Sequence, residues 1–196
     1  MRRSAILLAL SALLAPAPSL AQMSAGARLG AAVAIGDAGG SLPMREWTEG
    51  QVPVQLDVLY HVSPRVGVGG YFSWGFGLPG DACDGLDCSA TVTRLGAQAT
   101  YAFIGGAFVP WLGAGIGYEW NTVDDGSLEG TFTGFELLGL QGGGDFRVNE
   151  WFAFGPYVTF SISQYDDVEL GGVEGPILDK KVHAWLGLGV RGAFRL

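Results

Sequence analysis

Few side chains of this 196-residue chain have the types and spacing needed for chemistry, and its two histidines are the natural general bases. A histidine acting with a serine and an acidic residue is the set used in acyl transfer and hydrolysis. His183 is not followed by a serine two residues later, but Ser161 and Ser163 could approach it in space. His61 lies near the end of an alternating segment. We expect a non-enzymatic protein, and an acyl-modifying enzyme is the alternative.

The two cysteines, Cys83 and Cys88, are close enough in sequence to pair across a loop. Because no further cysteine and no nearby histidine completes a zinc ligand set, we predict a disulfide in place of a metal site. Three neighbouring aspartates, Asp81, Asp84 and Asp87, do not follow the spacing of an EF-hand loop. We therefore predict neither a metal ion nor a cofactor.

The N-terminus has the features of a secretory signal. Two arginines precede an apolar run (residues 5–15), and residues 19–21 place small side chains at the positions that signal peptidase reads. The run is too short to cross a membrane as a helix. We predict cleavage after Ala21, with a signal helix at residues 1–21 and one domain at residues 22–196. The mature chain then meets an oxidising compartment, in which a disulfide persists.

The elements that must position these residues follow from a strict alternation of apolar with small or polar side chains. In residues 183–196 the even positions are mostly leucine, valine and phenylalanine, and the odd ones include glycine and arginine. A period of two is that of a β-strand with two different faces. The pattern recurs in eight segments, near residues 25–35, 52–62, 66–76, 91–103, 108–120, 131–148, 152–162 and 183–196.

Long connections and short turns alternate between these segments. Short turns are predicted at residues 63–65, 104–107 and 149–150, and the other connections are long. An even number of strands with unequal connections is typical of an outer-membrane barrel. The glycine-rich residues 113–117 mimic a dinucleotide-binding loop, but no helix is expected after them, so we interpret them as interior glycines of a strand.

The composition of the two faces distinguishes a membrane barrel from a soluble one. The small face is rich in glycine, alanine and serine, which fit inside a narrow barrel, whereas a solvated exterior would carry lysine and glutamate. One exception is Glu136, which falls on the apolar face of its segment. Aromatic residues of the apolar face lie at both strand ends, as two interfacial girdles would place them. The girdle residues are Tyr60, Tyr101, Phe103, Phe108, Phe146, Phe152 and Phe194 near the short turns, and Trp74, Phe76, Tyr118 and Trp120 near the long loops.

Three segments carry a resemblance to a known family: residues 108–118 (FVPWLGAGIGY), 142–148 (GGGDFRV) and 151–157 (WFAFGPY). They resemble the small eight-stranded outer-membrane β-barrel proteins, which include the transmembrane domains of the OmpA and OmpX type. The resemblance implies the outer membrane of a Gram-negative bacterium and insertion by the barrel-assembly machinery. The C-terminus departs from the family pattern, because Leu196 and Arg191 stand where an aromatic residue and a glycine are common.

Negative charge is concentrated in the connections. Without the two signal arginines, nine basic residues face nineteen acidic ones, which excludes nucleic acid as a partner. With the short turns and both termini in the periplasm, four acidic loops are expected to be extracellular. Their charge serves solubility and repulsion or, alternatively, divalent-cation bridging to lipopolysaccharide. The fourteen acidic loop residues are Asp37, Glu46, Glu49, Asp81, Asp84, Asp87, Asp124, Asp125, Glu129, Asp166, Asp167, Glu169, Glu174 and Asp179.

Charges of both signs fall on the predicted interior face, together with large side chains. Eight strands enclose only enough space for side chains, and charges in a confined interior need partners. We therefore predict an all-β, eight-stranded antiparallel up-and-down transmembrane barrel, monomeric, with a lumen plugged by side chains. Alternatives are a lipid A-modifying enzyme and a narrow channel for small or hydrophobic solutes. The predicted interior network comprises Asp57, Arg94, Glu119 and Arg191, bridged by Gln98 and Gln141.

Overall fold

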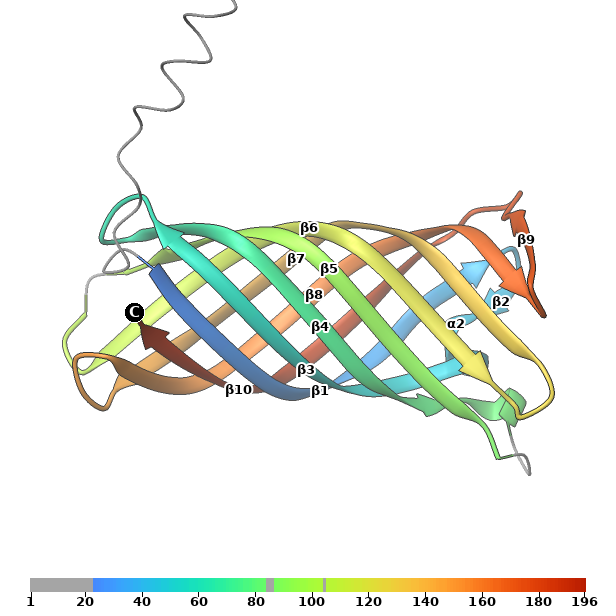
Figure 1. Cartoon of the computed structure of the whole chain (residues 1–196), viewed down its shortest axis with the longest axis horizontal. Helices are drawn as coiled ribbons and strands as arrows, with labels where there is room; N and C mark the ends of the chain where they lie inside the picture. The colour runs from blue at the N-terminus through green and yellow to red at the C-terminus, as the bar shows by residue number, and fades with distance from the viewer. Residues whose placement is uncertain (1–22, 84–86, 104) are drawn as a thin grey trace, which may run out of the picture.

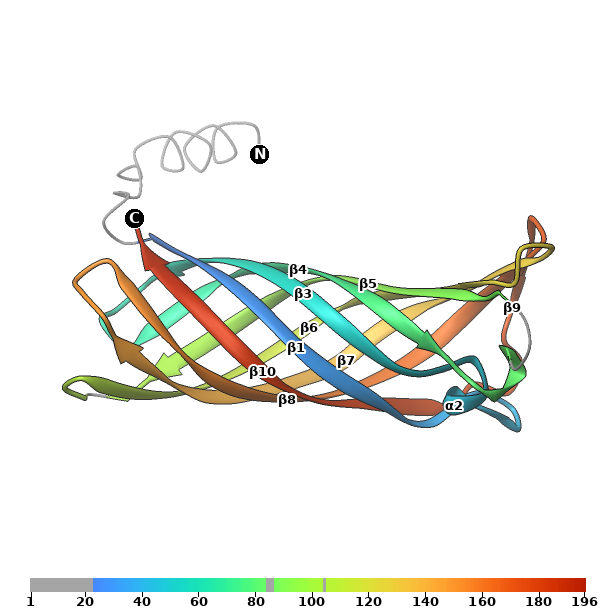
Figure 2. The ribbon, with the colours of Figure 1, turned by 90° about the horizontal axis from the view of Figure 1, so that it is seen from below.

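The structure, a computed structural model, describes residues 23–83, 87–103 and 105–196. The predicted signal peptide (residues 1–21) lies outside these residues and stays a prediction. In the described part of the chain, eight long antiparallel strands close into a barrel (Figures 1 and 2). They are β1 (Met23–Gly39), β3 (Thr48–His61), β4 (Val66–Pro79), β5 (Ser89–Ala102), β6 (Phe108–Asp124), β7 (Glu129–Arg147), β8 (Phe152–Leu170) and β10 (Val182–Arg195). The connections contain β2 (Leu42–Pro43), the short helix α2 (Met44–Trp47), a 3-10 turn at Asp81–Cys83 and β9 (Val173–Pro176).

Closure of the barrel satisfies the backbone along every long strand. Each long strand pairs with the next one in the sequence, and β10 pairs with both β8 and β1. The β1–β10 register is unbroken from Ser24 opposite Arg195 to Gly36 opposite His183. Lipid offers no hydrogen-bond partner to an open sheet edge, so closure is what allows a sheet to span a membrane. The predicted all-β barrel is confirmed.

The two faces are distributed as the alternation indicated, and the polarity of a soluble protein is inverted. Leu188 and Val158 are 67% and 59% exposed on the outside, whereas Asp57 and Trp185 are 3% and 1% exposed inside. Apolar exposure over a continuous band is stable only against lipid. No helix among the described residues is long and apolar enough to cross a membrane.

Aromatic rings gather at both ends of the apolar band. At the end with the short turns, the rings of Phe152 and Phe194 lie 4.8 Å apart between centroids, and other pairs join them. At the opposite end, the Trp74–Phe76 and Tyr118–Trp120 ring pairs are 5.0 and 4.7 Å apart. These positions match the two girdles that the sequence indicated.

The strands are longer than predicted, and the long connections are correspondingly shorter. Strands β6 and β7 pair as far as Asp124 opposite Glu129, so residues 125–128 form a tight turn where residues 121–130 were expected to be a loop. Residues 164–170 continue β8, and β9 folds back on it. In these extensions the inward positions stay buried, as at Val123 (7% exposed) and Tyr165 (0% exposed), but the outward positions are polar, as at Thr122. The apolar outer face therefore ends while the pairing continues. Eight of the predicted loop acids therefore lie on strands: Asp37, Glu49, Asp124, Glu129, Asp166, Asp167, Glu169 and Glu174.

A β-bulge in β7 explains the exception at Glu136. Gly115 of β6 pairs with Gly139 and Gly117 pairs with Glu136, so Leu137 and Leu138 together face one residue of β6. Both leucines are exposed on the outside, at 51% and 38%, and Glu136 is buried at 6%. The extra residue reverses the parity, so the expectation that Glu136 faces the membrane is wrong.

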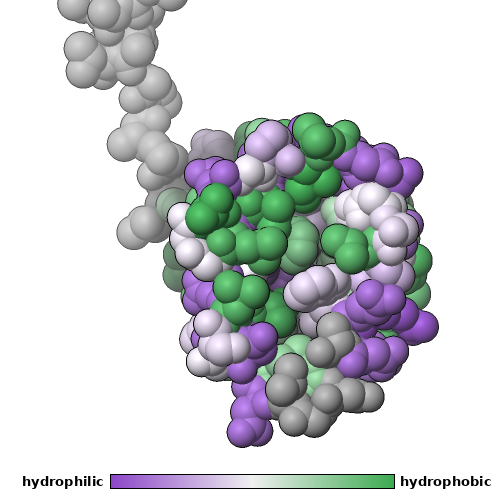
Figure 3. All heavy atoms as spheres, turned by 90° about the vertical axis from the view of Figure 1, so that its right-hand side faces the viewer, coloured by the Kyte–Doolittle hydropathy of each residue, from purple (hydrophilic) through white to green (hydrophobic). Residues whose placement is uncertain are grey.

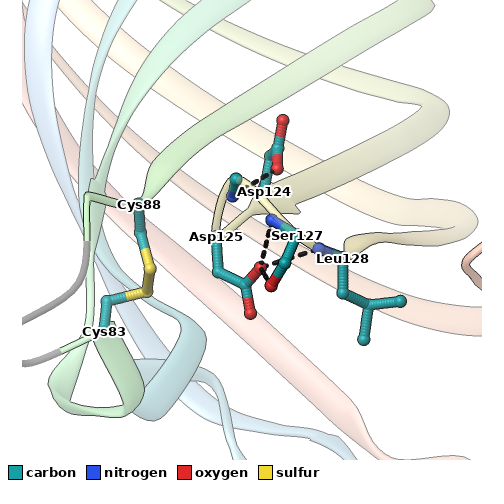
Figure 4. Close-up of a disulfide and its surroundings, with 7 residues drawn as sticks. Cys83, Cys88, Asp124, Asp125, Ser127 and Leu128 are labelled. Atoms are coloured by element: carbon teal, nitrogen blue, oxygen red, sulfur yellow. Dashed lines mark hydrogen bonds between the residues drawn. A yellow bond between two sulfur atoms is a disulfide. The ribbon is translucent and has the colours of Figure 1, made fainter.

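The end of the barrel that carries the longer connections is held by a disulfide and by a tight turn (Figure 4). Cys83 and Cys88 form the predicted disulfide just before β5. Next to β5, Asp125 Oδ1 accepts hydrogen bonds from the Ser127 hydroxyl at 2.7 Å and from the amides of Ser127 and Leu128. Figure 3 looks onto this end, where hydrophilic and hydrophobic residues are interspersed.

Candidate functional site in the barrel lumen

The most buried charge in the lumen is Glu119 of β6, which is 0% exposed. Its partner is Arg94, which lies directly opposite on β5 and donates from Nε to Glu119 Oε2 at 2.7 Å. The Arg94 guanidinium also lies 5.3 Å from the ring centre of Trp185. Two inward-facing positions in register on neighbouring strands thus form a buried, charge-assisted pair.

Four further side chains converge on the same carboxylate from β8 and β10. Tyr165 Oη and Trp185 Nε1 donate to Oε1 at 2.6 and 3.2 Å. His183 Nε2 lies 3.1 Å from Oε1, and Ser163 Oγ donates to Oε2 at 3.3 Å. We call Glu119, Arg94, Ser163, Tyr165, His183 and Trp185 the Glu119 cluster. Its hydrogen bonds cross the lumen and join strands that are not neighbours, so the cluster braces the interior.

The Glu119 cluster contains the residue types of a serine hydrolase, but not the arrangement. In a hydrolytic triad the histidine lies between the serine and the acid. Here the side chains of Ser163 and His183 both bond to Glu119, and among the described residues no side-chain hydrogen bond joins them to each other. Ser163 is 0% and His183 1% exposed, which leaves a substrate no access to the hydroxyl. Ser161 is also buried, and in the described part of the chain its hydroxyl has no hydrogen-bond partner.

A second carboxylate, Glu136, enters the lumen through the bulge of β7. The Tyr71 hydroxyl donates to Glu136 Oε2 at 2.6 Å. Sequence reasoning missed this pair because the bulge is not visible in the alternation. A glutamate on an otherwise apolar face was the signal that could have revealed it.

The middle of the lumen holds a chain of polar contacts around Arg28 of β1. Arg28 Nε donates to Asp57 Oδ1 at 2.9 Å, and its Nη1 donates to Gln141 Oε1. Gln141 Nε2 in turn donates to Gln98 Oε1 at 2.6 Å. Arg28 is 3% exposed and was not in the predicted network. Arg28 lies on the small-residue face of its strand, and this position could have indicated that its side chain belongs to the interior.

The third group lies toward the short turns. Arg191 Nη1 is 3.6 Å from Asp145 Oδ2, and its guanidinium stacks over Trp111 at 4.5 Å from the ring centre. Trp111 Nε1 donates to Asp145 Oδ1 at 3.0 Å. Asp145 is therefore shared between a cation and an indole.

The structure divides the six residues predicted as one network among these three groups. Arg94 and Glu119 are paired, and Gln98 and Gln141 are hydrogen bonded to each other. Asp57 pairs with Arg28, and Arg191 with Asp145, so the prediction of a single joined network is wrong. Counting along hairpins gives the register of neighbouring strands, but it does not show which long side chains meet across the lumen.

Two cavities lie beside these groups. The one in the middle of the lumen, lined by Tyr71, Arg94, Gln98, Glu136 and Trp185 among others, has a volume of about 60 Å³. Since a water molecule occupies roughly 30 Å³ in the liquid, this space suits a water or two. The other has a volume of about 640 Å³ and lies at the end with the short turns. Among the described residues, no cluster of three or more histidine, cysteine or acidic side chains could hold a metal ion.

The closed barrel, its apolar outer band and its polar interior define an integral outer-membrane β-barrel protein. The neisserial surface protein A is similar in structure, with 15% identity over 89% of this chain and 97% of that chain and a TM-score of 0.64. A major outer membrane protein of Thermus thermophilus has 13% identity over 88% of this chain and 99% of that chain, with a TM-score of 0.48. The attachment invasion locus protein Ail of Yersinia pestis has 16% identity over 87% of this chain and 99% of that chain, with a TM-score of 0.46. The sequence matches no protein-family model and no curated protein. At 15% identity the similarity to the neisserial protein shows the fold alone, which is the small outer-membrane barrel that the sequence indicated.

Proposed function

We propose that this protein is a non-enzymatic outer-membrane barrel with a lumen closed by side chains, which presents acidic segments at the cell surface. The observation that carries the proposal is the Glu119 cluster, whose hydrogen bonds cross the lumen from β5 and β6 to β8 and β10. The central cavity of about 60 Å³ supports the same conclusion, because it suits a water or two and not a solute.

Planar-bilayer recording tests the closed lumen. Purified protein is expected to give no steady conductance, whereas a general porin recorded under the same conditions gives large steps. A large, steady conductance of the wild-type protein would contradict the closed lumen. Small conductance steps that respond to a particular solute would instead favour the narrow channel.

The alternative of a lipid A-modifying enzyme rests on the residue types of the Glu119 cluster. Burial of Ser163 and His183, and the hydrogen bonds that both make to Glu119, support a structural role for them. Mass profiles of lipid A from cells with and without the protein are expected to be identical. A changed acylation pattern that a Ser163→Ala variant abolishes would establish the enzyme.

The orientation we propose places the short turns and both termini in the periplasm and the acidic end outside. The turn at Gly171 and Gly172 offers a test, because both residues are exposed where β8 turns back into β9. An epitope inserted there is expected to bind antibody on intact cells, and one attached after Leu196 only after the outer membrane is opened. The reverse result would overturn the orientation.

The partners we propose are the outer-membrane lipids, including lipopolysaccharide, and the barrel-assembly machinery during insertion. The exposed apolar band supports lipid contact. The acidic residues at the outer end support divalent-cation bridging to anionic lipopolysaccharide. We also propose a monomer. Sedimentation of the detergent-solubilised protein at the mass of one chain, 20.5 kDa less the signal peptide, is the expected outcome.

A further inference from the structure

The cavity at the short-turn end has a size and a lining that neither the closed lumen nor the outer loops require. Its volume of about 640 Å³ lies in the range typical of small-molecule sites, roughly 300–1,000 Å³. Four arginines line it, together with only two carboxylates. The arginines are Arg65, Arg147, Arg191 and Arg195, and the carboxylates are Asp145 and Glu150.

This concentration of positive charge runs against the composition of the chain. The formal net charge is −8, and residues 22–196 contain nine lysines and arginines against nineteen acidic residues. Four of those nine cations line one cavity, whereas two of the nineteen acids do. A concave, low-dielectric surface with an excess of one charge focuses its field and attracts the opposite ion.

Arg191 is the deepest of the four cations, and its hydrogen bonding is incomplete. It is 7% exposed, and among the described residues its Nε has no hydrogen-bond partner. Its carboxylate partner is Asp145, 3.6 Å from Nη1, and that carboxylate also accepts from the Trp111 indole. A buried N–H without a partner is costly. An anion in the cavity would supply the missing acceptor.

The remaining wall of the cavity is apolar and aromatic. Trp111 and Leu59, which are 3% and 1% exposed, line it from the inside. Trp151 and two rings of the girdle described above, Phe152 and Phe194, complete the lining. The rings of Trp151 and Phe194 are stacked at 6.2 Å between centroids. A ligand that satisfies both walls carries an anionic head and an apolar or aromatic body.

We propose that this cavity binds a small organic oxyanion, a phosphate or carboxylate attached to an aromatic or other apolar group. The guanidinium fork matches both oxyanions bidentately, and the rings accept the body of the ligand. Such a group could belong to a free solute or to the headgroup of a phospholipid. The cavity lies apart from the Glu119 cluster, so the binding of an anion here does not depend on the closed lumen.

Nuclear magnetic resonance of the refolded, ¹⁵N-labelled protein in uncharged octyl glucoside micelles tests the proposal. The indole N–H signals of Trp111 and Trp151 report on the cavity. Phenyl phosphate is expected to shift them saturably, inorganic phosphate more weakly and phenol not at all. High salt is expected to weaken the binding, because screening reduces the attraction.

The variants separate the cavity from general charge. Arg147→Gln combined with Arg195→Gln changes two exposed arginines, and is expected to weaken phenyl phosphate binding at least about tenfold, given the strength of hydrogen bonds to charged groups. Arg45→Gln removes an exposed arginine from α2 at the opposite end and is expected to leave binding unchanged. Heat-modifiable gel migration checks that each variant is folded.

A lipid arm distinguishes the two sources of the anion. In nanodiscs of phosphatidylglycerol, a headgroup bound in the cavity would shift the Trp111 signal before any addition, and phenyl phosphate would compete with it. An unshifted signal assigns the site to a free solute. Three results would overturn the proposal: no saturable shift in either medium, equal shifts with phenol, or full binding by the double variant.

Discussion

Removing the charge of Glu119 is the sharpest test of the closed interior. The Glu119→Gln substitution keeps the volume and one acceptor oxygen, but it leaves the buried Arg94 guanidinium without its counter-charge. Breaking a buried ion pair from one side costs about 3–5 kcal/mol. We expect a loss of that size for Glu119→Gln. Arg94→Gln should cost about 2–4 kcal/mol, because Tyr165 and Trp185 still donate to the carboxylate.

The double variant isolates the pair itself. With glutamine at both positions neither member of the pair leaves the other unpaired, so the combined loss is expected to fall short of the sum of the single losses by about 2 kcal/mol. Equilibrium urea unfolding in phospholipid vesicles, followed by tryptophan fluorescence, gives the free energy of unfolding for each variant. Gel migration without boiling confirms that each starts folded.

An exposed ion pair of nearly the same length is the matched control. Lys180 Nζ lies 2.6 Å from Asp166 Oδ1, but the two side chains are 42% and 25% exposed. The same single and double substitutions at Lys180 and Asp166 are expected to give a coupling energy between the two residues of under about 1 kcal/mol. If the losses of Arg94→Gln and Glu119→Gln simply add up in the double variant, the inference that the two buried charges depend on each other is refuted.

Three further predictions concern the lipid face and the end of the barrel with the longer connections. Placing arginine at Leu188, which is 67% exposed on the apolar band, is expected to cost about 2–4 kcal/mol in the same unfolding assay if the residue lies near the midplane. Replacing Cys83 and Cys88 by serine is expected to cost about 2 kcal/mol or less, since the disulfide closes a separation of only five residues. Hydrogen bonds from the hydroxyl and amide of Ser127 lower the pKa of Asp125. The stability that ionised Asp125 gives to the turn is therefore complete above about pH 4, and it is lost as the pH falls through the lowered pKa. A pH titration of the Ser127 amide signal measures this loss.

The barrel could be predicted from the sequence because one physical requirement acts on every strand. Lipid outside and a narrow lumen inside demand opposite side chains at successive positions, so parity assigns each residue to a face. The same rule placed Asp57 and Glu119 inside, where the structure has them. Counting from the short turn at residues 104–107 also brings Arg94 diagonally near Glu119, and the structure places the two directly opposite.

The bulge at Leu137 and the contacts across the lumen could not be predicted in the same way. A bulge shifts parity by one residue, and only the position of Glu136 on an apolar face hinted at it. The Arg28–Asp57 pair joins β1 to β3 diagonally, and the reach of an arginine leaves several carboxylates within range. The strand extensions were missed because their outward positions are polar, as at Thr122 and Asp166, so the alternation of apolar with small residues ends before the pairing does.

The interior of the barrel differs between its two ends because of the size of its inward-facing side chains. In the Glu119 cluster these positions hold Tyr165 and Trp185, which are 0% and 1% exposed and occupy the lumen. At the short-turn end, the positions lining the large cavity include Ala102, Ala153 and Ala193, and Ala153 lies opposite Ala193 between β8 and β10. Small side chains leave space, and arginines on the same face bring charge to its rim. Parity alone requires only that these residues be small or polar, so the choice of alanine beside arginine leaves space at this end, while tyrosine and tryptophan fill space at the other.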